Sequence, residues 1–351
     1  MRTLYILEKH ELEKDYKQPS DSTSEEKFKS IIDFPNFLLQ VLKIQNKDVS
    51  LDDKKLLDEF GYTNKKGRAL PDAIEFANSL LYYRTLFDKY IIKRKETDNN
   101  WSLRQPQKES KGELSYINTK FSTANGPENK DICMIQSMLH VSFPGNSHKE
   151  WLQDVLLLFK EKTNSSIDYQ DFRNKLKEIS KKFYDEYSTK GLNRGTGTER
   201  FIFNYLDYIL WRKYIDDVQG KAITKSDSLL GRIASNKERF DSFRFRQNNS
   251  VEHLHPQSKI DELEEDKDFK DKNEILNNFG NLCLIFEGSN SKFWNYDFSQ
   301  KKPIFDDLFK KRKSVESLKQ AIMFSYGKWN TKEIKEHAKE MTDAIDAYQC
   351  H

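Results

Sequence analysis

The sequence predicts a mainly α-helical protein with a small α+β part, and two observations support this fold class. Over residues 1–228, apolar side chains recur mostly at helical spacing. The pattern then changes to short strand-like runs and loops as far as about residue 302, after which helical spacing returns. We therefore predict a helical domain over residues 1–228 and a second domain over 229–351, with its α+β core at about 245–300.

Helices are expected in the first domain wherever apolar clusters follow a start signal. Asp33-Phe34-Pro35-Asn36 introduces an apolar helix over 37–42, and Pro71 begins a longer helix whose apolar face includes Ile74 and Leu81. The segment 95–130 is rich in Asn, Gly, Lys and Pro, which predicts a long loop. The helical pattern then resumes in four segments, at 130–141, 149–162, 168–188 and 197–217.

The second domain begins after a loop of Ser, Asp and Lys over 218–228. We expect residues 245–300 to form two antiparallel strands followed by a helix, because Phe279-Gly280-Asn281 is a turn signal ahead of an apolar strand. Pro256 favours the end of the first strand, since proline cannot donate to a strand ladder. Helical patterns at 306–309, 318–322 and 331–348 predict C-terminal helices that wrap this core.

Composition excludes several classes of protein. With 36% apolar and 33% charged residues, the 351-residue chain has a globular composition with a highly charged surface. No apolar run approaches the roughly 20 residues that span a bilayer, and the first residues do not form a secretory signal. The three cysteines, Cys133, Cys283 and Cys350, are far apart, so we expect a reduced cytoplasmic protein without a disulfide framework or a structural zinc cluster.

The chemistry-bearing residues lie in the α+β core. Glu252 and His253 stand on the first expected strand, Asn281 precedes the second, and Asn290 stands at the expected start of the helix. A carboxylate, a histidine and amide oxygens can together hold one divalent metal ion and activate a water molecule against a phosphodiester.

These motifs resemble a known nuclease family. Glu252-His253-Leu254-His255-Pro256-Gln257, followed by Phe279-Gly280-Asn281-Leu282, resembles the ββα-metal (HNH, or His-Me finger) nuclease core. More closely, it is similar to the C-terminal nuclease domain of GmrSD-type, modification-dependent (type IV) restriction endonucleases. Segments 37–43, 134–139 and 201–208 resemble the helical middle region of the same proteins. The resemblance implies an HNH endonuclease that hydrolyses DNA phosphodiester bonds in restriction or anti-phage defence, acting on foreign or modified DNA, such as DNA with glucosylated hydroxymethylcytosine.

Each candidate site residue has an expected role. His253 is the expected general base, because imidazole titrates near neutral pH. Glu252 is the expected ligand of one Mg²⁺ (or Mn²⁺) ion, and the spacing of the two asparagines in related nuclease cores selects Asn290 as the second ligand. Asn281 would accept the other ring N–H of His253 and fix its tautomer. His255 is an additional candidate, as a second ligand or a phosphate contact.

The basic segment after the core offers contacts to the DNA backbone. A net charge of only +3 gives weak support for nucleic acid, so the argument rests on local lysines and arginines that can neutralise phosphates. The candidates are Lys292, Lys301, Lys302, Lys311 and Arg312. A solvated helix face is the competing interpretation. The glycine-containing segment 191–198 lacks a phosphate-loop ending and is interpreted as a connection, with Thr198 as a helix cap.

The resemblance departs at the front of the chain, where the family carries a nucleotide-hydrolysing domain with an Asp-Gly-Gln-Gln-Arg signature that is absent here. We therefore expect a separately encoded nucleotide-hydrolysing partner to dock on apolar surface within the first 100 residues, which a pull-down or co-expression would test. Two other functions stay open: a non-catalytic helical scaffold or regulatory subunit with a retired nuclease core, and a ribonuclease that uses the same site.

Overall fold

The computed structural model describes most of the chain from residue 28 to residue 349. The described residues are 28–63, 67, 69–108, 114–122, 126–145, 149–162, 167–223, 228–247, 249–293 and 295–349. The predicted fold class is confirmed, since the described residues are mainly helical with three small antiparallel sheets. No helix among them is long and apolar enough to cross a membrane.

The chain divides into two compact units. Unit 1 comprises Met1–Cys133 and Gly145–Ile167, and unit 2 comprises Met134–Pro144 and Asp168–His351. The expected domain limits, 1–228 and 229–351, divide the chain differently, because residues 168–228 belong to unit 2. A helical domain over 1–228 and a nuclease domain over 229–351 stay a prediction.

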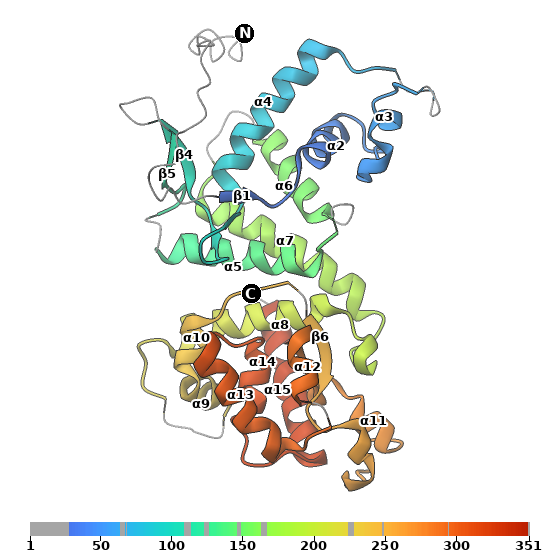
Figure 1. Cartoon of the computed structure of the whole chain (residues 1–351), viewed down its shortest axis with the longest axis vertical. Coiled ribbons are helices and arrows are strands. Elements are labelled where there is room, and N and C mark those ends of the chain that lie inside the picture. The colour runs from blue at the N-terminus through green and yellow to red at the C-terminus, as the bar shows by residue number, and fades with distance from the viewer. Residues whose placement is uncertain are drawn as a thin grey trace. The chain divides into compact units, whose positions relative to one another are not determined.

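Unit 1 combines helices with two small sheets. Its helical elements are α2 (Phe34–Gln45), the 3₁₀ turn η1 (Asp53–Lys55), α3 (Leu56–Glu59), α4 (Ala73–Tyr90) and α6 (Glu150–Glu161), together with the start of α5 (Pro127–Ser142). Its strands are β1 (Phe28–Ser30), β2 (Lys93–Lys95), β3 (Trp101–Ser102), β4 (Gln105–Lys108) and β5 (Leu114–Asn118), paired antiparallel in the orders β1-β2-β3 and β4-β5 (Figure 1). The expected long loop over 95–130 is therefore wrong, because β3, β4, β5 and the start of α5 lie within it.

The start of α2 follows the predicted signal. The Asp33 side chain accepts a hydrogen bond from the Asn36 backbone N–H at 3.0 Å, which satisfies one of the free donors at the helix start. Behind this cap, Phe37 packs edge-on against Phe87 of α4, with ring centroids 5.4 Å apart.

The buried face of α4 differs from the predicted one. Tyr83, Phe87 and Tyr90 are buried, whereas Ile74 is 77% exposed and Leu81 is 39% exposed. The aromatic residues in the second half of the helix determine which side packs inward. Other large apolar side chains within the first 100 residues are also exposed, namely Phe34, Leu57, Tyr62 and Leu70. A partner that docks in this region stays a prediction.

Unit 2 is built around α8 (Arg200–Lys213), in which eleven consecutive residues, Phe201 to Trp211, are buried. A helix that is buried on all sides lies at the centre of its domain. It contacts α7 (Tyr169–Ser188), α14 (Leu318–Met323) and α15 (Thr331–Gln349). The remaining helices are α9 (Leu229–Ser235), α10 (Lys237–Ser242), α11 (Lys272–Leu276), α12 (Glu287–Phe293) and α13 (Phe298–Arg312), with a π-helical turn at Tyr214–Val218 and 3₁₀ turns η3 (Gly195–Gly197), η5 (Gln257–Glu262) and η6 (Phe279–Asn281). The sheet of this unit pairs β6 (Asn249–His253) with β7 (Leu282–Phe286).

A buried polar network joins α8 and α14 to the turn before β7. Asp207 of α8 accepts hydrogen bonds from the Ser317 hydroxyl at 3.0 Å and the Lys319 backbone N–H at 2.8 Å. The Lys319 ammonium donates to the backbone oxygens of Phe279 and Leu282. Burial raises the pKa of Asp207 to about 7 and lowers the pKa of Lys319 to about 7. The network therefore holds the η6 turn against the central helix.

His337 of α15 is expected to make the protein sensitive to acid. Its ring is fully buried against Tyr326 and Trp329, and neither ring nitrogen has a hydrogen-bond partner among the described residues. Burial lowers the pKa of His337 well below its usual value, and the nearby Lys319 and Arg232 charges lower it further. In the unfolded chain, histidine titrates at about pH 6.5, so below this pH the unfolded state binds a proton that the folded state excludes.

The stability of the wild type should therefore fall as the pH decreases below ~6.5, by up to about 1.4 kcal/mol per pH unit from this group. His337→Phe should flatten this acid branch because phenylalanine keeps the ring and removes the titration. Denaturant unfolding at about pH 5 and about pH 8 measures the effect. An equal loss of stability in the variant and the wild type would contradict the assignment.

Candidate active site

The predicted order of two antiparallel strands and a helix is confirmed in unit 2. In the β6–β7 pair, Glu252 faces Cys283 and His253 faces Leu282. The first strand ends at His253, three residues before Pro256, and α12 begins directly after β7. The α12 helix contacts both strands, and because β7 ends at Phe286, opposite Asn249, α12 begins beside the start of β6 (Figure 1).

The turn before β7 requires a glycine. A Cβ atom on Gly280 would lie 2.0 Å from the backbone oxygen of Ile334 and 2.9 Å from the backbone nitrogen of Ala338, both in α15. The Phe279-Gly280-Asn281 signal in the sequence therefore reflects close packing of the turn against this helix as well as turn formation.

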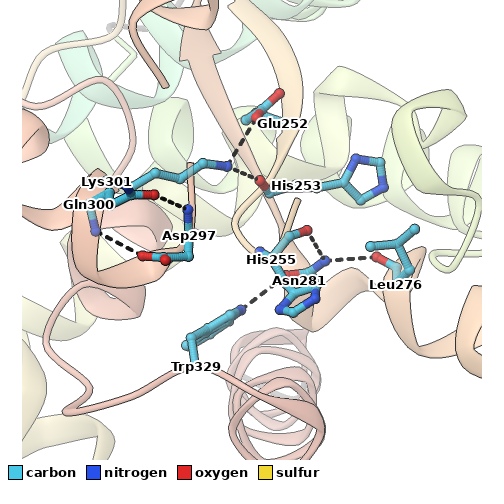
Figure 2. A network of polar contacts seen from close by, with 9 residues as sticks. All are labelled: Glu252, His253, His255, Leu276, Asn281, Asp297, Gln300, Lys301 and Trp329. Atoms are coloured by element: carbon cyan, nitrogen blue, oxygen red, sulfur yellow. Dashed lines mark hydrogen bonds and ion pairs between the residues drawn. The ribbon is translucent and has the colours of Figure 1, made fainter. Parts of the chain in front are cut away.

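Glu252 pairs with a buried lysine. The Lys301 ammonium lies 3.2 Å from Glu252 Oε1 and donates to the backbone oxygen of His253 at 2.7 Å (Figure 2). The Lys301 side chain is 1% exposed and the Glu252 side chain is 18% exposed. Burial raises the pKa of Glu252, although the Lys301 charge beside it acts in the opposite direction. The prediction that Lys301 contacts DNA is wrong, because α13 points this lysine inward to β6.

His253 is held by a residue that sequence analysis did not identify. Its Nε2 atom lies 3.1 Å from Oδ1 of Asn277, which directly follows α11. Burial lowers the pKa of His253; the hydrogen bond with Asn277 opposes this, and Lys301 and His255 lower the pKa further. The imidazole is therefore neutral at neutral pH, which is the form that can accept a proton.

Glu252 and His253 leave the strand in different directions (Figure 2). The ladder has no bulge at this point, so neighbouring side chains alternate between the two faces of the strand. No contact among the described residues joins the Glu252 carboxylate to the His253 ring. Asn290 lies in α12, and its side chain is outside the described part of the structure. The convergence of the three side chains on one pocket stays a prediction.

Asn281 stabilises the loop after β6. The prediction that it contacts the His253 ring is wrong. Its Oδ1 accepts from the His255 backbone N–H at 2.8 Å and from Trp329 Nε1 at 3.0 Å (Figure 2). Its Nδ2 donates to the backbone oxygens of His255 and Leu276, at 3.2 and 2.9 Å. These contacts use all of the hydrogen-bonding capacity of the Asn281 amide. The asparagine that lies next to the His253 ring is Asn277.

The additional candidate, His255, has a contact within its own turn. Its Nε2 atom lies 2.8 Å from the backbone oxygen of Lys259, and because a carbonyl only accepts, this nitrogen carries a proton. Burial lowers the pKa of His255. A role for His255 as a second ligand or phosphate contact stays a prediction.

The other predicted cationic residues differ in exposure. Lys292 of α12 and Lys311 of α13 are exposed, and Lys311 pairs with Asp307 at 2.6 Å. Lys302 is half-buried and donates to the Tyr326 backbone oxygen at 3.4 Å. Arg312 is half-buried and contacts Ser289 at 3.0 Å and Glu316, so it helps fix the start of α12.

The segment 191–198 contacts the residues next to His253. The Gly195 backbone N–H donates to the Asn277 backbone oxygen at 3.2 Å, and η3 contacts β6. Asn193 Oδ1 accepts from the Phe279 backbone N–H at 2.8 Å. Thr198 donates to the Leu192 backbone oxygen at 2.8 Å and makes no cap of α8, which corrects the expected capping role. The segment is a connection, as predicted, and it also packs against the residues that hold His253.

The residues present fit a divalent ion that has few protein ligands. Among the described residues, no group of three or more His, Cys, Asp and Glu side chains could hold a metal. Mg²⁺ commonly keeps several waters and uses only one or two carboxylates together with substrate phosphates. Glu252 supplies one partly exposed carboxylate, and its Oε2 atom has no hydrogen-bond partner among the described residues. Zinc fits less well, because Cys283 is buried in β7 and faces no second sulfur or imidazole ligand among the described residues.

Comparison with known proteins agrees with the predicted resemblance. The family model described as GmrSD restriction endonucleases, C-terminal domain, matches residues 159–344, which is more than half of the chain. The match includes the whole ββα unit, which is formed by β6, β7 and α12. No curated protein and no solved structure matches the chain. By the extent of the family match, the chain belongs to the GmrSD restriction endonucleases, through their C-terminal domain.

Proposed function

We propose that this chain is a metal-dependent HNH endonuclease that hydrolyses DNA phosphodiester bonds, in the cytoplasm, as part of a restriction system against foreign or modified DNA. One observation carries the proposal: the buried His253 stands at the end of β6, directly after the carboxylate of Glu252, in a chain that belongs to a restriction endonuclease family. Phosphodiester hydrolysis needs a base for the attacking water and positive charge near the phosphate.

Each residue of the site has a task in this chemistry. His253 takes the proton from the attacking water, and its neutral state at neutral pH permits this step. Glu252 and Asn290 would hold one Mg²⁺ or Mn²⁺ ion, which supplies the charge that stabilises the phosphate and the leaving oxygen. Asn281 keeps the loop after His253 in place. Lys292 and Lys311, which are exposed, would contact phosphates, with smaller contributions from Lys302 and Arg312.

The divergence of Glu252 and His253 is compatible with this arrangement. In an in-line displacement, the attacking water and the leaving oxygen lie on opposite sides of the phosphorus atom. A phosphate placed across the end of β6 would meet the base on one side and the metal-binding carboxylate on the other. Two neighbouring residues on a regular strand provide such opposite directions.

The presence of Glu252 and of a buried, neutral His253 argues against a retired core that serves only as a scaffold or regulator. Cleavage of RNA is the alternative outcome of the experiment below, because a base and a metal ion can hydrolyse a phosphodiester whether or not the sugar carries a 2′-hydroxyl group. The experiment incubates the purified chain with plain plasmid DNA, DNA carrying glucosylated hydroxymethylcytosine, and RNA, each with Mg²⁺, with Mn²⁺ or with a chelator.

We expect metal-dependent cleavage of DNA. Cleavage of RNA alone would assign the ribonuclease function. The assay is repeated with a nucleotide-hydrolysing partner and nucleotide, because the family resemblance predicts such a partner. Intact substrates under all these conditions would overturn the proposal.

A further inference from the structure

We propose that Asn277 is a positioning residue that fixes the tautomer of His253, with the proton on Nε2 and the free lone pair on Nδ1. Nδ1 is then the atom that accepts the proton from the attacking water. The role of Nδ1 as the base rests on the proposed nuclease function, whereas the tautomer concerns only the ring and its hydrogen bond to Asn277.

The orientation of the Asn277 amide determines which group faces the histidine. Its Nδ2 donates to the Asn273 backbone oxygen at 3.0 Å, one turn earlier in α11. Its Oδ1 therefore faces His253 Nε2, at 3.1 Å. A carboxamide oxygen only accepts hydrogen bonds, so the ring nitrogen opposite it must carry a proton.

Gly195 holds Asn277 in this position from the other side. The Gly195 N–H donates to the Asn277 backbone oxygen at 3.2 Å. Gly195 has a φ of 57°, and a Cβ atom there would lie 2.4 Å from Asn277 Oδ1. Only glycine combines this backbone conformation with so close an approach. The 191–198 segment therefore packs directly against Asn277 Oδ1, the atom that contacts His253.

The consequence for His253 concerns its second nitrogen. A neutral imidazole carries one ring proton, so a proton on Nε2 leaves an unshared electron pair on Nδ1. Within the described residues, Nδ1 of His253 has no hydrogen-bond partner, and it is not among the buried polar atoms that lack one. It therefore keeps some contact with solvent, as a base that acts on water requires. Replacing a residue that orients a functional imidazole typically lowers affinity or activity by about 10- to 100-fold.

The test measures the tautomer directly by NMR on the full chain labelled with ¹⁵N in its histidines, at a pH where the rings are neutral. The His253 signals are assigned by their loss in His253→Gln. We expect a protonated Nε2 and an unprotonated Nδ1 in the wild type and in Asn277→Asp, which keeps an acceptor oxygen. Asn277→Leu, which has a similar size and no acceptor, should give a mixture of tautomers. Asn273→Ala is the matched control, because it removes an exposed amide from the same helix and keeps the backbone oxygen.

Cleavage rates separate positioning from a merely structural role. Asn277→Leu should lower kcat by about 10- to 100-fold with little change in KM, Asn277→Asp should recover most of that loss, and Asn273→Ala should equal the wild type. A proton on Nδ1 in the wild type overturns the proposal, even if Asn277→Leu does not fold. An unchanged tautomer in folded Asn277→Leu also overturns it. If the chain cleaves no nucleic acid, the proposed function fails, and the NMR result still decides the tautomer.

Discussion

Replacing His253 with alanine is expected to eliminate DNA cleavage while leaving the fold and DNA binding nearly intact. A general base contributes to the chemical step and not to affinity, and its removal typically lowers the rate by 10²- to 10⁴-fold. The ring is 4% exposed, and its side-chain hydrogen bond is to Asn277, so its loss removes one contact at the end of a strand. The expected cost in stability is about 1–2 kcal/mol, which is within the usual range for single substitutions.

The measurement compares plasmid cleavage, DNA binding and thermal unfolding for His253→Ala and the wild type. His140→Ala is a matched control, because His140 is another buried histidine of unit 2 and lies in α5, outside the ββα unit. We expect the control to cleave DNA at close to the wild-type rate. Full activity in the His253→Ala protein would exclude His253 as the general base.

The second large effect is expected from Glu252. Glu252→Gln keeps the shape of the side chain and removes its charge, so cleavage should fall at least about 100-fold and require a higher Mg²⁺ concentration. Removing metal from the wild type with a chelator should stop cleavage, and adding Mg²⁺ or Mn²⁺ should restore it. Asn290→Ala should weaken both the rate and the dependence on metal.

Lys301 allows the role of Glu252 in metal binding to be separated from its role in stability. Its ammonium is buried against Glu252, so the glutamine variant leaves a buried charge without its partner and should destabilise the fold by about 1–3 kcal/mol. In the double variant Glu252→Gln/Lys301→Met, the buried charge is also removed, so stability should recover while cleavage should not. Denaturant unfolding and plasmid cleavage of the wild type, Glu252→Gln, Lys301→Met and the double variant measure these effects. Recovery of cleavage in the double variant would show that Glu252 acts only through the ion pair.

The sequence alone determined the features of this protein that depend on local chemistry. Apolar spacing predicted the helices at 149–162 and 168–188, and the structure has α6 and α7 there. The turn at Phe279-Gly280-Asn281 predicted a strand after it, and the resemblance of the motifs to a known nuclease core predicted the ββα unit and the family. Helical periodicity and turn preferences act over a few residues, so one sequence is sufficient to detect them.

Only the tertiary structure decided which side chains meet. Lys301 lies 49 residues from Glu252 in sequence, and nothing in its basic segment distinguishes it from the exposed Lys311 until its side chain meets Glu252 in the folded chain. Asn277 contacts His253 across 24 residues, although Asn281 is the asparagine that the motif favours. In the expected loop, β3 pairs with β2, and β4 and β5 pair with each other, so these strands depend on backbone pairing that the Asn, Gly, Lys and Pro content did not reveal. These contacts arise from the packing of whole elements, and local sequence preferences carry no information about that packing.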